Sequence, residues 1–239
     1  MSEMVLSLRN IVKHYALGLE KLTVLHDLNL DIQRNDFVAL TGPSGSGKST
    51  LMNILGCLDK PSSGEYFLGG RDVSQLSEDE LSAVRNRRIG FIFQSFNLLP
   101  RHSALDNVAH PLIFRGEKLQ QRRAMARQAL EDVGLGDRVD HYPNQLSGGQ
   151  KQRVAVARAL VGQPDILLAD EPTGNLDSKT TETMMQLFEN LHHQGQTLVI
   201  VSHESDIAAR CKRQIILRDG VIESDTNQAT HGGALAHEL

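Results

Sequence analysis

Short apolar segments alternate with longer amphipathic segments through most of the chain. Short runs rich in Val, Ile, Leu and Phe predict buried strands at 37–40, 89–93, 166–169, 197–201 and 214–218. Between them, apolar residues recur at helical spacing beside capping residues and predict helices at 47–58, 78–86, 120–133, 150–161 and 178–193. This order of elements is typical of an α/β domain with a mainly parallel sheet.

Two regions depart from that order. Residues 5–9 and 28–32 alternate apolar and polar side chains, which predicts an N-terminal antiparallel sheet with one face in solvent. From about 96 to 146 helical patterning replaces the strand pattern, so we expect an inserted helical lobe. We expect one domain over 1–226 and a mobile C-terminal tail over 227–239.

The composition argues against several classes of protein. The formal net charge is −4, and the basic runs at 85–88 and 122–127 are expected to be solvated helix faces, so we expect no nucleic acid partner. Cys57 and Cys211 match no metal or redox spacing and suit packing positions in a reducing compartment. The longest apolar runs are strand-length, so we expect no direct membrane insertion.

A glycine-rich segment stands between the predicted strand 37–40 and the helix that follows it. It reads GPSGSGKS over 42–49 and fits the phosphate-loop pattern, for which an ordinary glycine turn is the alternative. Its backbone N–H groups can surround phosphates, the helix N-terminus and Lys48 add positive charge, and Ser49 can bind Mg²⁺ through its hydroxyl. We therefore expect ATP and Mg²⁺ as cofactors, with the nucleotide contacted by Gly42, Pro43, Ser44, Gly45, Ser46, Gly47, Lys48, Ser49 and Thr50.

Two adjacent carboxylates, Asp170 and Glu171, follow the predicted strand 166–169. Ligands of open α/β sheets bind beyond the carboxyl ends of the strands, so both acids should reach the same rim as the phosphate loop. Because successive strand side chains point in opposite directions, we expect Asp170 to face Mg²⁺ and Glu171 to polarise the attacking water. A plain acidic turn is the alternative, and the phosphate loop favours the catalytic interpretation.

The segment LSGGQ over 146–150 has both a structural and a functional interpretation. Ser147 and Gln150 fit a capping box that opens the predicted helix 150–161. Gly148 and Gly149 add bare backbone beside a helix N-terminus, which makes an anion site with no lysine of its own. Such a site indicates that it completes the phosphate loop of another subunit in a head-to-tail dimer.

Together with Gln94, the segment 175–177 and His203, these motifs occur in the order and spacing of ABC ATPases. The resemblance covers about 5–223. It implies a P-loop NTPase core with a mainly parallel α/β sheet, an N-terminal antiparallel β subdomain and an inserted helical lobe. It also implies a homodimer on ATP binding, in which each nucleotide lies between one subunit's phosphate loop and the other's Ser147, Gly148, Gly149 and Gln150.

The same resemblance implies roles for single residues. Tyr15 stacks on adenine, although alone it would be interpreted as a packing residue. Gln94 couples the γ-phosphate and Mg²⁺ to the helical lobe, and Asp177 signals across the dimer. The implied catalytic residues are Glu171, His203, Lys48 and Gln94, and the implied Mg²⁺ ligands are Ser49, Gln94 and Asp170.

Three segments, 41–56, 94–100 and 171–177, resemble the lipoprotein-release and macrolide-export branch, which includes LolD, MacB, FtsE and YbbA. That branch pairs with FtsX-like permeases that act on the extracytoplasmic side. The resemblance implies a peripheral ATPase on the cytoplasmic face of the bacterial inner membrane, bound to an integral membrane partner. Residues 34–36 and 202–204 depart from the usual family pattern, but they keep an acid at 36 and at 204 and remove no catalytic group.

Two other functions compete with this hypothesis. The first is the ATPase of a solute importer. The second is a soluble ABC protein in DNA repair or translation, which would need long coiled-coil insertions, zinc sites or two ATPase halves. Residues 96–112 mix apolar residues with turn formers, which suits either a groove for a partner helix or ordinary lobe packing.

Overall fold

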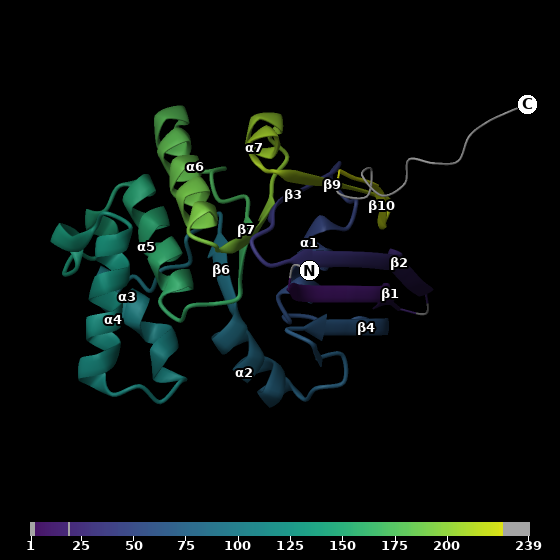
Figure 1. The fold of residues 1–239 in the computed structure, drawn as a ribbon, viewed down its shortest axis with the longest axis horizontal. Helices are drawn as coiled ribbons and strands as arrows, with labels where there is room; N and C mark the ends of the chain where they lie inside the picture. The colour runs from purple at the N-terminus through teal and green to yellow at the C-terminus, as the bar shows by residue number, and fades with distance from the viewer. Residues whose placement is uncertain (1–2, 19, 227–239) are drawn as a thin grey trace, which may run out of the picture.

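The structure, a computed structural model, describes residues 3–18 and 20–226, and the predicted tail 227–239 lies outside them. Two sheets lie side by side, and helices pack on both faces of the larger one (Figure 1). Within the described part of the chain, no helix is long and apolar enough to cross a bilayer.

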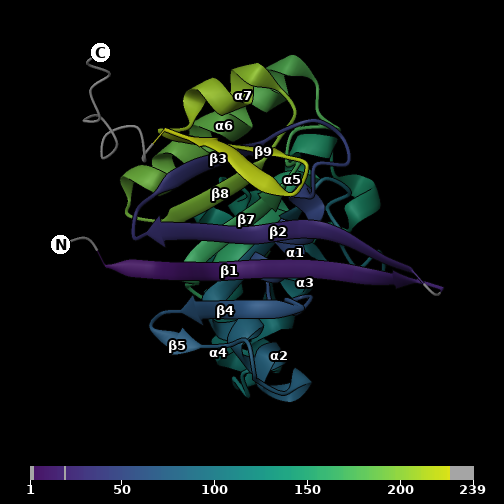
Figure 2. The same ribbon diagram turned by 90° about the vertical axis from the view of Figure 1, so that its right-hand side faces the viewer.

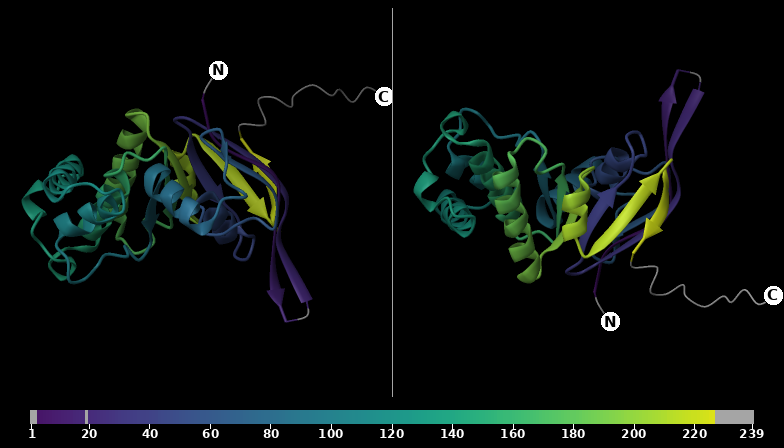
Figure 3. Two further views of the ribbon diagram at one scale, coloured as in Figure 1. Left: turned by 90° about the horizontal axis from the view of Figure 1, so that it is seen from below. Right: turned by 90° about the horizontal axis from the view of Figure 1, so that it is seen from above.

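The smaller sheet is antiparallel, as the N-terminal pattern predicts. Its strands lie in the order β2-β1-β4-β5, with bounds β1 (Met4–Leu17), β2 (Glu20–Gln33), β4 (Ser63–Leu68) and β5 (Arg71–Asp72). Leu28, Leu30 and Ile32 are buried and Asn29 is exposed, so β2 presents one apolar face. Figure 2 shows this sheet, and in Figure 3 the distal part of the β1–β2 hairpin extends beyond the body of the protein.

The larger sheet carries the strands that the apolar runs predict. Its order is β10-β9-β3-β8-β7-β6, with bounds β3 (Phe37–Thr41), β6 (Ile89–Phe93), β7 (Ile166–Asp170), β8 (Thr197–Val201), β9 (Arg213–Arg218) and β10 (Val221–Asp225). All pairs are parallel except β9 with β10. The carboxyl ends of β3, β6, β7 and β8 therefore share one edge.

The two faces of this sheet bury separate apolar cores. Alternate residues of β7 divide between them, since Leu167 and Ala169 join the core under the helical lobe, whereas Ile166 and Leu168 join the core under the smaller sheet. A strand buried on both faces reads as a continuous apolar run, which explains why β7 and β8 are visible in the sequence.

Seven α-helices and two 3₁₀ turns complete the described chain. Their bounds are α1 (Lys48–Leu55), α2 (Glu78–Arg88), α3 (Ala104–Ile113), α4 (Leu119–Asp132), η1 (Gly136–Arg138), η2 (Pro143–Gln145), α5 (Gly148–Leu160), α6 (Ser178–His193) and α7 (Ser205–Arg210). Helices α3, α4 and α5 pack together, and the regular structure between 96 and 146 is helical, as predicted.

Some boundaries differ from the predictions for local reasons. Helix α1 stops at Leu55 rather than 58 because Gly56 caps it and Cys57 adopts a left-handed backbone with φ 52°. Helix α5 starts at Gly148 rather than 150 because Ser147 is its N-cap. The pattern did not separate α3, whose interior contains Pro111, and it missed the short helix α7.

Arg213 joins the two sheets through a buried ion-pair network. Its guanidinium donates to the Asp225 carboxylate at 2.9 and 2.6 Å, to Asp36 at 2.9 Å and to the Asp31 carbonyl at 2.8 Å. The side chains of Arg213 and Asp225 are 9% and 0% exposed. Burial opposes the charge of Arg213, but the two carboxylates outweigh burial and raise its pKa.

Arg213→Met should lower the free energy of unfolding by about 3–5 kcal/mol, because it leaves buried carboxylates without their guanidinium. Arg9→Met is the matched control: Arg9 also binds a carboxylate through two nitrogens, but the pair with Asp31 is 43% and 40% exposed. Its loss should stay below about 1 kcal/mol. Urea unfolding monitored by circular dichroism measures both, and equal losses would contradict the network's role.

Candidate nucleotide site

The phosphate loop, residues 42–47, connects β3 to the N-terminus of α1. Lys48, the first residue of α1, donates from Nζ to the carbonyl oxygens of Gly42 and Pro43 at 2.7 and 2.8 Å. Within the described chain, no side chain caps α1 and no acid lies in its first turn. The N–H groups and dipole of this helix end therefore have no carboxylate of the helix's own first turn to compete with, which suits an anion.

Two glycines of this loop, Gly42 and Gly47, are required by its packing. Gly42 has φ 143°, and a Cβ there would overlap the Leu217 carbonyl oxygen of β9. Gly47 has φ 102°, and a Cβ there would lie 2.9 Å from Leu25 Cδ2 of β2. The Ser46 hydroxyl is buried and has no hydrogen-bond partner within the described residues. Bare backbone, a lysine and an unpartnered hydroxyl are a donor set that fits nucleotide phosphates.

Strand register brings the other candidate residues to the same edge. Leu40 pairs with Val201, Val201 with Asp170, and Asp170 with Phe93. The predicted site residues follow these positions within two residues, namely Gly42 after β3, His203 after β8, Glu171 after β7 and Gln94 after β6. The structure therefore gathers four segments that are distant in sequence.

Asp170 ends β7 and lies within electrostatic range of Lys48. Burial raises the pKa of Asp170, the charge of Glu171 raises it further, and Lys48 opposes both. Among the described residues, no cluster of three His, Cys, Asp or Glu side chains could hold a metal alone. Mg²⁺ is usually held by one or two carboxylates together with substrate phosphates, so Asp170 and the exposed Ser49 fit the ion as a nucleotide complex.

Glu171 and His203 form a hydrogen-bonded pair. His203 Nδ1 lies 2.8 Å from Glu171 Oε1, and this bond and the carboxylate charge raise the pKa of His203. The other carboxylate oxygen, Glu171 Oε2, is buried without a hydrogen-bond partner among the described residues. A carboxylate whose second oxygen has no hydrogen-bond partner keeps the capacity to accept a proton from a water that reaches it.

The prediction that strand alternation orients the Glu171 side chain is wrong. Strand β7 ends at Asp170, and Glu171 has a left-handed backbone with φ 45°. Its N–H donates to the Val201 carbonyl at 3.0 Å, which holds this turn against β8. The backbone turn, rather than the pleat, aims the Glu171 side chain.

Gln94 lies against the loop that follows Glu171. A Cβ on Gly174 would lie 2.7 Å from Gln94 Nε2, and Asn175 Nδ2 donates to the Gln94 carbonyl at 3.0 Å. The turn after Gln94 contains two left-handed residues, Phe96 and Asn97. The end of β6 is thus in direct contact with the loop that carries Glu171.

The capping box at the start of α5 is confirmed. Gln150 N donates to Ser147 Oγ at 3.3 Å, and Ser147 N donates to Gln150 Oε1 at 2.9 Å. No hydrogen bond or ion pair within the described chain joins residues 147–150 to the chain's own phosphate loop. Asp177 caps α6 by accepting from Thr180 N and Oγ1 at 3.0 and 2.6 Å, bonds that lower its pKa.

Tyr15 lies on β1 beside the turn that follows α1. Its hydroxyl donates to Asp59 Oδ2 at 2.9 Å, and Lys13 Nζ lies 4.8 Å from the ring centroid. Lys13 also binds Asp59 Oδ1 at 2.6 Å. These contacts fix a ring that is 37% exposed, and its stacking on adenine stays a prediction.

Comparison with known families decides the class of protein. A sequence profile described as ABC transporter matches residues 25–174. This chain belongs to the ABC transporter family. The ABC fold, the ATPase activity and the cofactors ATP and Mg²⁺ expected from the sequence are confirmed for the chain, whereas the roles of its individual residues stay predictions.

Relatives of this ABC ATPase include separate ATP-binding proteins and larger fused ones. The uncharacterized ABC transporter ATP-binding protein YknY of Bacillus subtilis is 51% identical over 95% of this chain and 99% of its own length. The macrolide export ATP-binding/permease protein MacB of Shewanella sp. strain ANA-3 is 52% identical over 94% of this chain, which spans 34% of MacB.

Solved structures agree with this assignment. Two dimeric structures of the ATP-binding cassette MJ0796, one of them a post-hydrolysis state bound to ADP and Pi, superpose with a TM-score of 0.83 at 46% and 47% identity. Each match covers 92% of this chain and 97% of the other.

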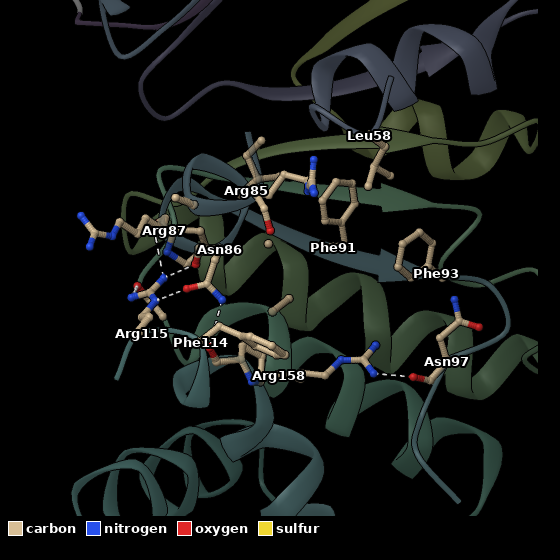
Figure 4. A pocket seen from close by; sticks show the side chains of 18 of the residues that line it. Leu58, Arg85, Asn86, Arg87, Phe91, Phe93, Asn97, Phe114, Arg115 and Arg158 are labelled. Atoms are coloured by element: carbon tan, nitrogen blue, oxygen red, sulfur yellow. Dashed lines mark hydrogen bonds between the residues drawn. The ribbon is translucent and has the colours of Figure 1, made fainter. Parts of the chain in front are cut away.

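The ABC cassette also contains a groove of about 720 Å³ between its core and its lobe (Figure 4). Asn97 and Pro111 come from the segment that the sequence suggested for a groove, while most of the lining comes from α2, β6 and α5. Arg158 on α5 donates to the carbonyl oxygens of Asn97 and Phe96 at 2.5 and 2.8 Å. Arg158 was not among the predicted site residues, although an arginine within the otherwise apolar stretch 154–161 was a visible signal.

Glu171→Gln should abolish ATP turnover and leave ATP binding intact, because the amide keeps the shape but cannot take a proton. The same change should lower the pKa of His203 toward its ordinary value, because it removes the carboxylate that raises it. Single-turnover hydrolysis, nucleotide titration and NMR titration of His203 measure the three quantities. Hydrolysis near the parent rate would show that Glu171 is not the base, even with the shift of His203 present.

Proposed function

We propose that this ABC ATPase works as an ATP-bound homodimer on the cytoplasmic face of a bacterial inner membrane. There it drives a separate FtsX-like integral membrane partner that exports or extracts substrate on the extracytoplasmic side. The MacB relatives are named as combined ATP-binding/permease proteins, and this chain matches about one third of their length. This match supports an ATPase that works with a membrane permease. The dimeric cassette MJ0796 supports the homodimer.

The observation that carries the enzymatic part of the proposal is the Glu171 carboxylate. One oxygen is held by His203 and the other is buried and unpartnered, at the sheet edge that also carries the phosphate loop. Glu171 accepts the proton of the attacking water, and His203 holds that carboxylate and the water in place. Positioning and charge stabilisation by fixed groups supply the remaining rate enhancement.

The other site residues bind and orient the nucleotide. Residues 42–50 hold the phosphates, with the charge of Lys48 on the β- and γ-phosphates. Ser49, Asp170 and Gln94 hold Mg²⁺, which supplies charge neutralisation on the phosphate oxygens when it is bound. Tyr15 stacks on the base. The site is completed by Ser147, Gly148, Gly149 and Gln150 of the second copy, and Asp177 lies at the contact between the copies.

The groove between core and lobe is the docking surface for the membrane partner. Phe91, Phe93 and Phe114 give it an apolar lining, and Phe114 is 74% exposed. Four arginines, at 85, 87, 115 and 158, line it with one acid, Asp79. The described residues place no carboxylate in an ion pair with these arginines. Arg85, Arg115 and Arg158 donate instead to carbonyl and amide oxygens.

The charge of this groove indicates the chemistry of its occupant. Burial lowers the pKa of Arg158, and burial and the charge of Arg87 lower the pKa of Arg115. An anionic group in the groove would relieve both effects. The partner therefore presents a short cytoplasmic helix with an apolar face and acidic side chains. Arg158 also holds the turn after Gln94, so docking of the partner can shift the position of Gln94 in the nucleotide site.

The test is to tag the chain, solubilise native membranes in mild detergent and identify co-purifying proteins by mass spectrometry. We expect a permease with few membrane helices and a large extracytoplasmic domain. Arg87→Glu in the groove should lose that protein, while Arg127→Glu, an exposed arginine on α4 outside the groove, should keep it. A multi-helix importer would replace the export hypothesis, and a soluble or ribosomal partner would overturn the membrane motor.

A further inference from the structure

Gln152 is a buried polar residue on the inner face of α5. It is 0% exposed, and its Nε2 donates to the Pro172 carbonyl at 2.7 Å. Its Oε1 is buried without a hydrogen-bond partner within the described residues. A buried amide oxygen without a partner costs free energy, so packing alone does not account for a glutamine at this position.

The partner of Gln152 lies next to the candidate base. Pro172 directly follows Glu171, and as a proline it has no N–H with which to hold its own position. The Gly174 N–H donates to the Glu171 carbonyl at 3.1 Å, which closes a tight turn around Pro172. The bond from Gln152 thus holds the Pro172–Thr173 peptide group, one residue beyond Glu171.

The start of α5 also contacts the far end of this loop. A Cβ on Gly149 would clash with Thr180 Cγ2, and a Cβ on Gly148 would lie 3.5 Å from Leu176 Cδ2. Thr180 in turn binds the Asp177 carboxylate. Both ends of the loop 171–177 therefore rest on the first two turns of one helix, and Figure 1 shows α5 and α6 side by side.

We propose that Gln152 is a positioning residue that couples the anion site at the start of α5 to Glu171 of the same chain. The inference rests on the proposed dimer, in which residues 147–150 contact the nucleotide held by the second copy. A helix moves as a rigid unit, so phosphates bound at Ser147 and Gly149 shift Gln152 and the Pro172 carbonyl with it. Each chain then sets its own base according to the occupancy of the other copy's site.

The test compares Gln152→Met with a matched control, Gln196→Met. Gln196 also donates from Nε2 to a proline carbonyl, that of Pro164 at 3.3 Å, but at the opposite end of β7. Methionine preserves side-chain length and removes the donor. The ATP dependence of steady-state hydrolysis gives the Hill coefficient, and thermal unfolding and ADP affinity report whether each variant is folded.

We expect the wild type and Gln196→Met to approach the two-site limit of about 2, and Gln152→Met to fall toward about 1 with ADP affinity unchanged. In Gln152→Asn the side chain is too short to reach the Pro172 carbonyl, so this variant should show the same Hill coefficient as Gln152→Met. It replaces Gln152→Met in the test if that variant is unstable. If folded Gln152 variants keep the wild-type Hill coefficient, the proposed coupling through Gln152 is wrong, whereas the proposed dimer is unaffected. A wild type that hydrolyses ATP without cooperativity and stays monomeric with ATP overturns both.

Discussion

In-register parallel pairing of β3, β8, β7 and β6 is the constraint on which the rest of the structure depends. It places Leu40, Val201, Asp170 and Phe93 in one row, so the segments that follow them leave the sheet at the same edge. A slip of one residue in β7 would exchange its two buried faces and move Asp170 away from Lys48. The apolar cores on both faces of the sheet penalise that slip, so packing far from the nucleotide fixes the geometry at the nucleotide.

Beyond the sheet edge, the loop 171–177 connects the parts of the site. It reaches β8 through the Glu171 N–H, the end of β6 through Asn175, and α5 through the Pro172 carbonyl. Arg158 extends these contacts from the turn after Gln94 to the groove. Most of these bonds use backbone carbonyls, which are fixed in position by the chain itself. A change at the groove or at α5 can therefore reach Glu171 without a change in the sheet.

The sequence predicted what depends on local pattern and missed what depends on tertiary contact. Strands β7 and β8, the Ser147 capping box and the phosphate loop carry their own signals and were found. The orientation of Glu171 was predicted from strand alternation, which its backbone does not follow because Glu171 is left-handed and its N–H is bonded to β8. Gln152 and Arg213 look like surface residues in a sequence, and only the fold shows the carbonyl and carboxylates that hold them. Helix α3 was not separated because Pro111 within it resembles a terminator.

The central claim is that two copies of this chain complete each other's nucleotide sites, and complementation tests it most directly. Lys48→Ala removes the phosphate-loop charge and Ser147→Arg blocks the start of α5, so neither homodimer should retain ATP. Mixing the two should restore ATP retention at up to about one quarter of the wild-type sites, because about half of the dimers are mixed and each has one intact site. The double variant mixed with the Lys48→Ala variant forms no dimer with an intact site and is the control. A mixture that dimerises and retains no more ATP than this control would contradict the account.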